Sequence, residues 1–320
     1  MKDWRHSWFQ IFSFIALVAA MGAEIACGGG FEFRVAQRPD CIVVEDGGKP
    51  VMKYLFAPAQ YKPYVSELRT TTGFNVLRDA PKDHHHHHGL MYGIKVNGVN
   101  FWEEISGSGV QKVVSTAWAE ESGRNAPCAV ITQELHWLAA PDAFLPEDRV
   151  VPLLKERRKL TLSVDRAAGE TRLIWHARFE VPGKTNVVSL TGSSYHGLGA
   201  RFIAALDSAS NHVTDSGNPD LSGTKQDVSR HPWEAVVFNA GDTKATFAIL
   251  GFPQNARKEP MFFGMRHPFT YLSATQGLDK EPLVYKSGDV FEISYQVLLY
   301  PEAKSSQWLS ERWNRFARGE

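Results

Sequence analysis

The chain has 320 residues, of which 43% are hydrophobic, and 35 lysines and arginines balance 35 aspartates and glutamates. A chain of this length buries a large core, in one big domain or two packed together. The balanced charge lacks the basic excess typical of nucleic-acid-binding proteins, and neither end carries a charged tail.

The N-terminus has the pattern of a targeting segment. Lys2 and Arg5 precede an apolar run at 11–20, and small residues follow at 20–23. The run is shorter than a membrane span, which needs about 20 apolar residues. We expect residues 1–26 to be a signal peptide and residues 27–320 to be one exported domain, periplasmic or extracellular.

Two alternatives to simple export remain open at this end. A lipoprotein attached at Cys27 is disfavoured, because Glu24 stands where a lipidation motif has an apolar residue. A retained N-terminal anchor is the other reading. Farther along, Cys41 and Cys128 either form a disulfide, which export permits, or remain as buried thiols. Their spacing does not fit a thiolate metal site.

Beyond residue 30 the sequence predicts β-structure. Short segments rich in β-branched and aromatic residues alternate with Gly, Asp, Asn or Pro. Two hairpin turns are indicated, at DGGK (46–49) and VNGV (96–99), since glycine adopts positive φ without steric cost. The strand-like segments are 31–37, 41–56, 91–102, 128–138, 160–166, 171–181, 245–252 and 290–300.

Alternating polarity is clear in two of these segments. At 172–180 apolar side chains occupy one face and polar ones, including His176, the other; at 130–137 Glu134 lies on the polar face. Such strands place the apolar face on a second sheet and the polar face toward water or a ligand. We therefore take His176 and Glu134 as candidate ligand-binding residues, with a solvated surface as the alternative.

The C-terminal third contains a polar stretch and a helix. Residues 207–233 are long, polar and turn-rich, as in a functional loop, and Trp233 at its end is a candidate for stacking on a sugar. After Pro301, Leu309, Trp313 and Phe316 recur at helical spacing. The pattern predicts an all-β fold of stacked antiparallel sheets with a C-terminal capping helix.

Five consecutive histidines at 84–88 are the most unusual feature. In an extended strand alternate side chains point to opposite faces, so all five cannot serve one centre. If the segment turns, two or three can converge. Imidazole suits both a transition metal and proton transfer near neutral pH, and a solvated polar loop is the plain alternative.

The residues around the histidines resemble an uncharacterised bacterial family of the DUF6807 type, whose members are sometimes labelled methane oxygenases. Its pattern combines Pro-Tyr, Asp-His-x-His-His-Arg-Gly-Leu and Val-Asn-Gly-Val-Asp-Phe-Trp elements, followed by Gly-x-Gly-x-Arg and His-Pro-x-Asn-x-x-x-Pro. The resemblance covers about residues 30–300. His88 stands where the family has Arg, and Phe252 where it has His. The matching residues are Pro63, Tyr64, Asp83, His84, His86, His87, Gly89, Leu90, Val96, Asn97, Gly98, Val99, Phe101, Trp102, Arg201, Asn255, Pro260 and Arg266.

The resemblance implies a β-supersandwich, the architecture of galactose mutarotases and several polysaccharide lyases, and thus a carbohydrate ligand. Fold by itself does not settle function. The methane-oxygenase label does not fit, because a membrane subunit needs several long apolar spans and none follows residue 21.

If the matched histidines and arginines meet, they support proton abstraction next to a carbonyl of an oxidised or acidic sugar, because preorganised donors stabilise developing negative charge. The candidate class is a carbohydrate lyase, epimerase or glycoside-cleaving enzyme. Glycoside hydrolysis with two carboxylates would use Glu134 and Glu156. A divalent metal ion is a candidate cofactor, with His84, His86 and His87 as ligands. The candidate catalytic residues are His86, His87, Arg201 and Arg266, and the candidate ligand-binding residues are Asn255, Tyr195, His196, Trp233, His176 and Glu134.

Two other classes remain open from the sequence. One is a non-catalytic carbohydrate-binding or cell-surface module, and the other is a metal-dependent oxygenase. Trp102, Trp137 and Trp175 are further stacking candidates, although tryptophan is more often a core residue. The sequence does not distinguish oligomeric states.

Overall fold

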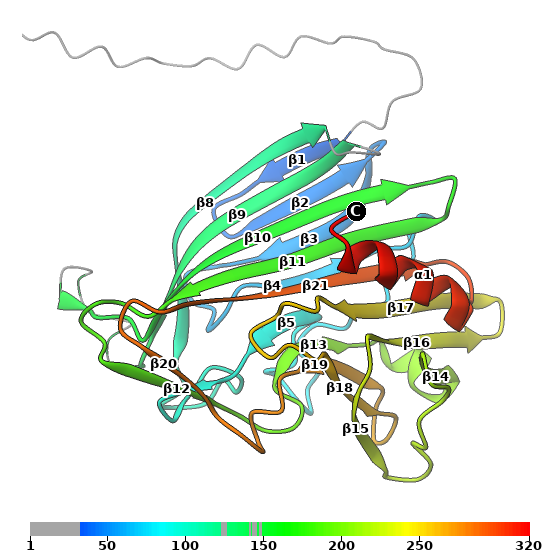
Figure 1. Cartoon of the computed structure of the whole chain (residues 1–320). Coiled ribbons are helices and arrows are strands. Elements are labelled where there is room, and N and C mark those ends of the chain that lie inside the picture. Colours follow the sequence, from blue (N-terminus) through cyan, green and yellow to red (C-terminus); the bar gives the residue numbers. More distant parts are fainter. Residues whose placement is uncertain (1–32, 123–126, 141, 143–145, 147–148) are drawn as a thin grey trace, which may run out of the picture. The chain divides into compact units, whose positions relative to one another are not determined.

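The computed structural model describes residues 33–122, 127–140, 142, 146 and 149–320, and residues 31–320 form one compact unit. The expected signal peptide (1–26) and Cys27 lie outside the described residues. The described residues form two large antiparallel sheets, a small third sheet and one α-helix (Figure 1). The expectation of an all-β supersandwich with a capping helix is confirmed, with the third sheet as an addition.

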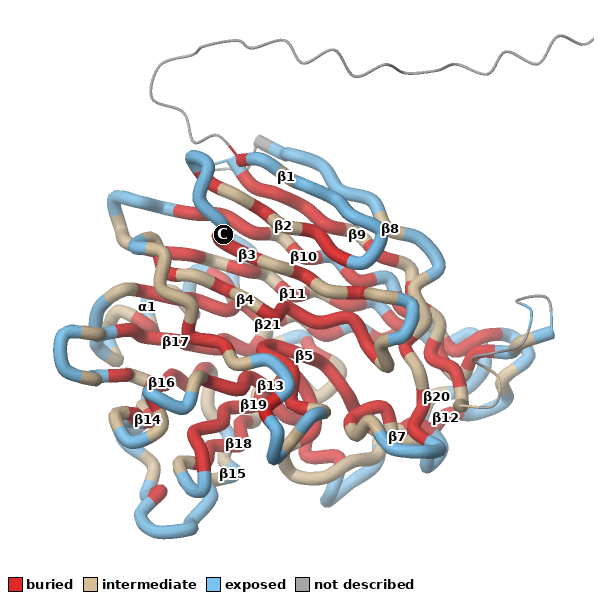
Figure 2. Tube along the Cα trace, turned by 180° about the vertical axis from the view of Figure 1, so that it is seen from behind, coloured by how far each residue is buried: buried red, intermediate tan, exposed pale blue. Residues whose placement is uncertain are grey.

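The first large sheet has nine strands and contains the segments around the histidine run. Its central strands are buried along their length (Figure 2). In spatial order the strands are β1 (Phe33–Gln37), β2 (Cys41–Asp46), β3 (Lys49–Leu55), β4 (Tyr64–Leu68), β5 (Leu90–Gly93), β13 (Gly197–Arg201), β19 (Tyr271–Thr275), β18 (Met261–Met265) and β15 (Gln226–Arg230).

The second large sheet has eight strands, and α1 (Ser306–Ala317) lies on it. A four-stranded sheet and the 3-10 helix η3 (Ala204–Ala209) complete the unit. The eight strands are β14 (Ser210–Thr214), β16 (Trp233–Ala240), β17 (Thr243–Gly251), β21 (Val290–Tyr300), β11 (Glu170–Glu180), β10 (Leu154–Asp165), β9 (Pro127–Leu138) and β8 (Val110–Ser122). The small sheet consists of β20 (Leu283–Lys286), β12 (Val187–Thr191), β6 (Lys95–Val96) and β7 (Val99–Asn100).

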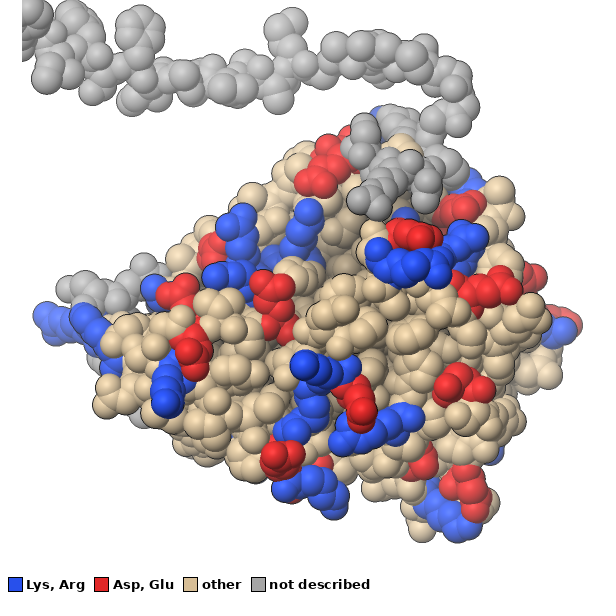
Figure 3. Space-filling view, viewed as in Figure 1, with Lys and Arg blue, Asp and Glu red and all other residues tan. Residues whose placement is uncertain are grey.

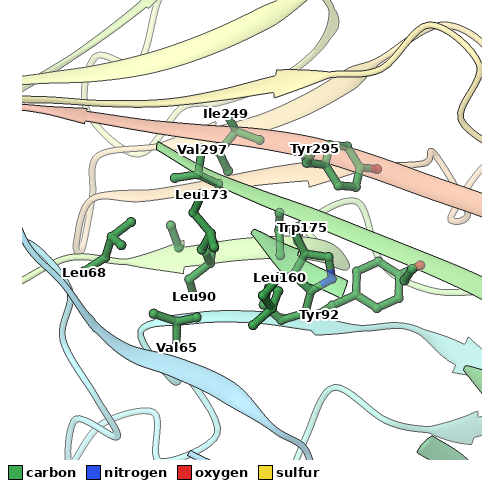
Figure 4. Packing of buried hydrophobic residues seen from close by; sticks show 14 of the residues in the cluster. Val65, Leu68, Leu90, Tyr92, Leu160, Leu173, Trp175, Ile249, Tyr295 and Val297 are labelled. Atoms are coloured by element: carbon green, nitrogen blue, oxygen red, sulfur yellow. The ribbon is translucent and has the colours of Figure 1, made fainter. Parts of the chain in front are cut away.

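The main core fills the space between the two large sheets. Leu90 and Tyr92 of the nine-stranded sheet face Leu173, Trp175 and their neighbours from the other sheet (Figure 4). The alternation at 130–137 and 172–180 is confirmed, since Ile131, Leu135, Trp137, Leu173, Trp175, Ala177 and Phe179 are buried, whereas Thr132, Glu134, His136, Arg172, His176, Arg178 and Glu180 are half-buried or exposed. Each sheet therefore has one face in the core and one outer face.

Both predicted hairpin turns are present. Asp46 pairs with Lys49 across Gly47 and Gly48, and the 96–99 turn joins β6 to β7. The two glycines of the first turn have φ of 57° and 74°, which glycine adopts without strain. Local turn chemistry therefore sets these registers.

Two expectations for the C-terminal third are wrong. Residues 207–233 are not a structureless loop, because β14 and β15 lie within them. Trp233 begins β16 and is fully buried beneath α1, with its indole N–H donating to Ser310 Oγ at 3.2 Å. Its ring has no face open to a sugar. The helix is confirmed, with Leu309 and Phe316 buried against the sheet.

The two cysteines of the described chain are both buried free thiols. The disulfide alternative is therefore not the one that the structure shows. Burial raises the pKa of the Cys41 and Cys128 thiols, so both remain protonated near neutral pH.

A charged pair, Glu156 and Arg158, lies inside the sandwich, and its position rules out Glu156 as a catalytic carboxylate. Glu156 and Arg158 are each 1% exposed, and Arg158 Nε donates to Glu156 Oε1 at 2.7 Å. Trp137 also donates to Glu156, and Arg158 reaches Gln111 and the Pro63 carbonyl. Glu156 is thus an internal counter-ion, and the pair ties β10 to the segment that enters β4.

Replacement of Glu156 by Gln should destabilise the protein strongly, since it leaves the Arg158 guanidinium buried without a balancing charge. The expected loss is about 3–5 kcal/mol of unfolding free energy, measured by urea titration. Glu134→Gln, on the exposed side of neighbouring β9, is the matched control and should cost less than about 1 kcal/mol. Equal losses in the two variants would contradict this role for Glu156.

Candidate functional site

The histidine run folds into two successive turns. The His84 amide donates to the Pro81 carbonyl at 3.0 Å, and the His87 amide donates to the His84 carbonyl at 2.9 Å. The His87 carbonyl accepts from the Ala80 amide at 3.0 Å, which closes the loop at its base. The segment 81–88, called here the His loop, is therefore turned rather than extended, and this allows several of its histidines to converge.

Three of the histidines pack against one another. The ring centroids of His84 and His87 are 4.7 Å apart and stacked, and His86 lies 4.5 Å from His87, edge to face. His85 is exposed. The His87 ring also stacks on Tyr271 of β19 at 5.5 Å. The His loop thus covers the outer face of the nine-stranded sheet.

The strand under the His loop is β13, which carries the Gly-x-Gly-x-Arg element. Leu198 and Ala200 point into the core, so Gly197, Gly199 and Arg201 share the outer face. A Cβ on Gly199 would lie 1.8 Å from the Tyr271 hydroxyl and 2.8 Å from the Trp102 ring. Glycine is needed there because the two aromatic side chains occupy that space.

Arg201 ends β13 and contacts the His loop directly. Its guanidinium lies 3.3 Å from the ring centroid of Phe269, which also contacts the rings of His84 and His87. Its Nη2 is 3.7 Å from Asp83 Oδ2, and its backbone N–H donates to the Gly89 carbonyl. The predicted meeting is thus observed for His87 and Arg201, which share the Phe269 ring, and His86 joins this cluster through its contact with His87.

Tyr195 and His196 complete this cluster from the segment before β13. The His196 ring stacks on Trp102 at 5.0 Å, and Tyr195 lies edge-on to Trp102 at 5.8 Å. Phe263, Tyr271 and Met91 pack around them on the outer face. His196 is buried, whereas Tyr195, His84 and His86 are half-buried and form the rim of the cluster.

Buried polar atoms without hydrogen-bond partners are concentrated in this cluster. In the described part of the chain 17 buried side-chain polar atoms lack a partner, and six belong to four neighbouring residues. Buried polar groups are nearly always satisfied in native proteins, so such a concentration points to a missing polar ligand or ordered water. The six atoms are His87 Nδ1, Trp102 Nε1, His196 Nδ1 and Nε2, and Arg201 Nε and Nη1.

Electrostatics keep these imidazoles neutral. Burial lowers the pKa of His87 to about 2, and the Arg201 guanidinium and any protonation of neighbouring His86 or His84 act in the same direction. Burial and nearby Lys95 lower the pKa of His196 to about 3. Burial also lowers the pKa of Arg201 to about 10, although Asp207 and Asp83 oppose this. Near neutral pH the cluster combines neutral His87 and His196 with the buried guanidinium of Arg201.

His88 faces the other way, into a charged network. Its Nδ1 is 2.7 Å from Asp79 Oδ1, and its Nε2 is 2.9 Å from Glu104 Oε1. Glu104 also accepts from Lys62 Nζ at 2.7 Å, and the His88 ring stacks on Tyr64 at 3.9 Å. Burial alone would lower the pKa of His88, but the hydrogen bonds to Asp79 and Glu104 raise it.

His88 therefore acts as an imidazolium between two carboxylates. A neutral imidazole has one N–H and would turn a lone pair toward one of them. This explains how His occupies the position where the resemblance places Arg. The network fixes the position of the base of the His loop, because it joins His88 to Asp79 and Glu104. Sequence reasoning missed Lys62, Asp79 and Glu104, since nothing in their spacing marks them as partners.

The metal interpretation of His84, His86 and His87 does not fit this arrangement. Among the described residues, no group of three or more His, Cys, Asp or Glu side chains could hold a metal ion. The rings of His84 and His87 are stacked, so they present faces to each other rather than converging nitrogens. His84 Nδ1 instead lies 2.9 Å from Asp83 Oδ2.

The remaining candidates lie at several places in the unit. Arg266 follows β18, whose Met265 pairs with Tyr271, so it reaches the same end of the sheet as Arg201, and its Nε is buried without a partner. Asn255 bonds both backbone groups of Ser294 on β21 and serves as a structural clamp. Trp102, Trp137, Trp175 and Trp233 are all fully buried.

The polar face of the eight-stranded sheet is a solvated surface. Glu134 pairs with Arg157 at 3.6 Å, and His176 lies 3.9 Å from Glu292. Charges of both signs are interspersed on this side of the unit (Figure 3). Glu134 faces outward and Glu156 inward on adjacent strands, so they do not flank a common ligand and the two-carboxylate hydrolase reading fails.

Two concave regions lie outside the His-loop cluster. A groove of about 1110 Å³ is bordered by β8 and the loop 56–63, and its lining residues include no His, Asp or Glu. A pocket of about 310 Å³ near α1 contains His176, Asn255 and Phe252. We place the candidate site at the His-loop cluster despite the larger groove, because several imidazoles lie beside a buried guanidinium there and some of their buried polar atoms lack partners.

Comparison with known proteins identifies the family. Residues 41–314 match the model of the family of unknown function DUF6807, and the chain belongs to that family. No curated protein matches the chain. No helix in the described residues is long and apolar enough to cross a membrane.

Solved structures with a similar fold include large glycosidases. A family 36 α-galactosidase from Geobacillus stearothermophilus is 11% identical, with 83% of this chain and 40% of that chain covered and a TM-score of 0.48. A family 97 glycoside hydrolase from Pseudoalteromonas sp. strain K8 is 10% identical, with 78% and 34% covered and a TM-score of 0.42.

The galactose mutarotase related enzyme of Lactobacillus acidophilus is 8% identical, with 86% of this chain and 100% of that chain covered and a TM-score of 0.34. The chain spans about two fifths of the length of the α-galactosidases. These likenesses concern the fold, and no residue role is transferred from them.

The His88 network should make stability depend on pH. Because the folded pKa of His88 is raised above 6.5, its stabilising effect is fully present below about pH 6.5 and is lost as pH rises through the folded pKa. His88→Gln should therefore lower the melting temperature most in mildly acidic buffer, and the difference from wild type should shrink as pH rises through the raised pKa of His88. His85→Gln, exposed in the same loop, is the control; a gap for His88→Gln that stays constant with pH would refute the imidazolium assignment.

Proposed function

We propose that this protein is an exported carbohydrate-active enzyme that removes a carbon-bound proton next to a carbonyl of an oxidised or acidic sugar. The observation that carries the proposal is the concentration of unpartnered buried donors and acceptors beside half-buried imidazoles in the His-loop cluster. Export rests on the N-terminal pattern at residues 1–26.

A sugar fits the composition of the cluster. The Tyr195 ring is half-buried at the rim, whereas the rings of Trp102 and Phe269 are buried beside the imidazoles and the guanidinium. Apolar walls combined with a few convergent polar groups are typical of small-molecule sites, and a sugar offers both an apolar ring face and hydroxyl groups. The proposal does not depend on the fold likeness to glycosidases.

His86 is the residue best placed to accept the proton. It is half-buried at the rim, and burial followed by the charges of Lys62 and His84 lowers its pKa from 6.5. It is therefore unprotonated near neutral pH and accessible to a ligand. In the reaction the C–H bond breaks, its electron pair moves into the adjacent carbonyl to form an enolate, and the proton goes to His86.

His87 and Arg201 have a different task from His86. With a pKa of about 2, His87 is too weak a base for proton abstraction near pH 7 and serves as a neutral hydrogen-bonding group. The Arg201 guanidinium beside it stabilises the developing negative charge on the enolate oxygen. Arg266, at the same end of the sheet, is a candidate for further charge stabilisation.

A non-catalytic carbohydrate-binding module is the alternative that the same geometry supports. Such a module would use Tyr195, the imidazoles at the rim and the buried donors without moving a proton. It predicts saturable binding with no exchange of carbon-bound hydrogen. The metal-dependent oxygenase reading receives no support from the ring arrangement of the three histidines.

Replacement of His86 by Asn should reduce proton abstraction at least about 100-fold, because the proton acceptor is removed. The measurement is solvent-deuterium incorporation at the carbon next to the carbonyl of uronic and keto sugars, followed by NMR. His85→Asn, exposed on the same loop, should retain the wild-type rate. An unchanged rate in His86→Asn would exclude it as the base.

The pH dependence of the wild-type rate provides a second check. Because the pKa of His86 is lowered from 6.5, the base form persists below pH 6.5, and the rate should fall only at lower pH. A rate that already falls as pH drops from about 8 toward 6.5 would assign proton transfer to another group.

A further inference from the structure

We propose that Arg201 binds the carboxylate of an acidic sugar, and that Asp83 occupies this anion position until the ligand displaces it. The inference rests on the proposed function. It narrows the proposed substrate class from oxidised or acidic sugars to acidic sugars. It concerns equilibrium binding, so it can be tested without turnover.

The Arg201 guanidinium is a buried cation with unused donors. Its side chain is 2% exposed, yet Nε and Nη1 have no hydrogen-bond partner. A buried charge is costly unless it is paired and hydrogen-bonded, and Phe269 on one face offers only its ring. The other nearby charges are those of Arg78, Asp207 and Asp83, which lie close enough to affect Arg201 electrostatically.

Asp83 marks where an anion approaches. Its Oδ2 lies 3.7 Å from Arg201 Nη2, which is too long for a hydrogen bond, and the same oxygen is 2.9 Å from His84 Nδ1. The Asp83 side chain is 51% exposed, whereas Arg201 is buried. An exposed carboxylate on a loop, weakly engaged by a buried guanidinium, is an exchangeable counter-ion.

The chemistry favours a carboxylate over a ketone. A guanidinium presents several N–H groups in a plane that matches two carboxylate oxygens, and a full negative charge compensates its desolvation. A keto oxygen offers a partial charge and would leave the cation largely unbalanced. In a uronate the carbon that carries the carboxylate bears the proton to be removed, so the same contact serves binding and reaction.

The experiment compares two matched pairs of ligands, D-galacturonate with D-galactose and D-glucuronate with D-glucose, by titration calorimetry at low ionic strength. Each pair differs only at the carboxylate. At least one acid should bind wild type about tenfold or more tightly than its neutral partner. Arg201→Gln should abolish that preference.

Asp83→Asn should change the affinity for acidic sugars in the opposite direction from Arg201→Gln. Because Asp83 is exposed, this variant is expected to fold and keeps the test independent of folding. It removes the competing carboxylate and its like-charge repulsion, so acid binding should tighten several-fold while neutral sugars bind as before. Lys82→Gln, on the same exposed turn, is the control and should leave the acid preference intact.

Three results would overturn the assignment: no binding of either acid, equal binding of acid and neutral partner, or an Asp83→Asn affinity equal to that of wild type. Tight, Arg201-dependent acid binding without deuterium incorporation would uphold it and refute the proposed enzymatic function instead. The two proposals therefore fail separately.

Discussion

The close packing of the His loop and its aromatic neighbours on the outer face of the nine-stranded sheet is the constraint on which the site depends. Three glycines permit it. A Cβ on Gly89 would lie 2.3 Å from the Val65 carbonyl, and one on Gly197 would lie 2.1 Å from the Ala274 carbonyl. With Gly199 beneath Tyr271, these positions let backbone and rings approach where any side chain would clash.

This packing places adjacent histidines in opposite electrostatic environments. His87 turns into a buried region with positive neighbours and stays neutral, whereas His88 turns toward two carboxylates and is protonated. The adjacent residues His87 and His88 are thus a neutral imidazole that can hydrogen-bond a ligand and an imidazolium that holds the base of the His loop in place. A homopolymeric run thus provides two distinct functions because its turns direct each ring to a different partner.

The sequence predicts strands where burial imposes a visible period of two, as at 130–137 and 172–180, but it does not mark β4, β8, β12–β16 or β18–β20. It also predicts the meeting of the His run with Arg201, through the family pattern rather than through spacing. It fails for Trp233 and Asn255, because polarity and turn propensity do not say which sheet a segment joins. Lys62 and Glu104 were missed for a related reason: their partner His88 is brought to them only by the fold.

The two outer faces of the sandwich explain why function is assigned to one of them. On the eight-stranded sheet, pairs such as Glu134 with Arg157 are exposed, so water satisfies their polar atoms and no ligand is required. On the nine-stranded sheet, loops cover the face and exclude water from His87, His196 and Arg201, whose polar atoms remain unpartnered. Polar atoms that are buried without hydrogen-bond partners gain more free energy from a polar ligand than exposed atoms that already bond to water. The His-loop cluster contains such buried atoms, and the outer face of the eight-stranded sheet is exposed.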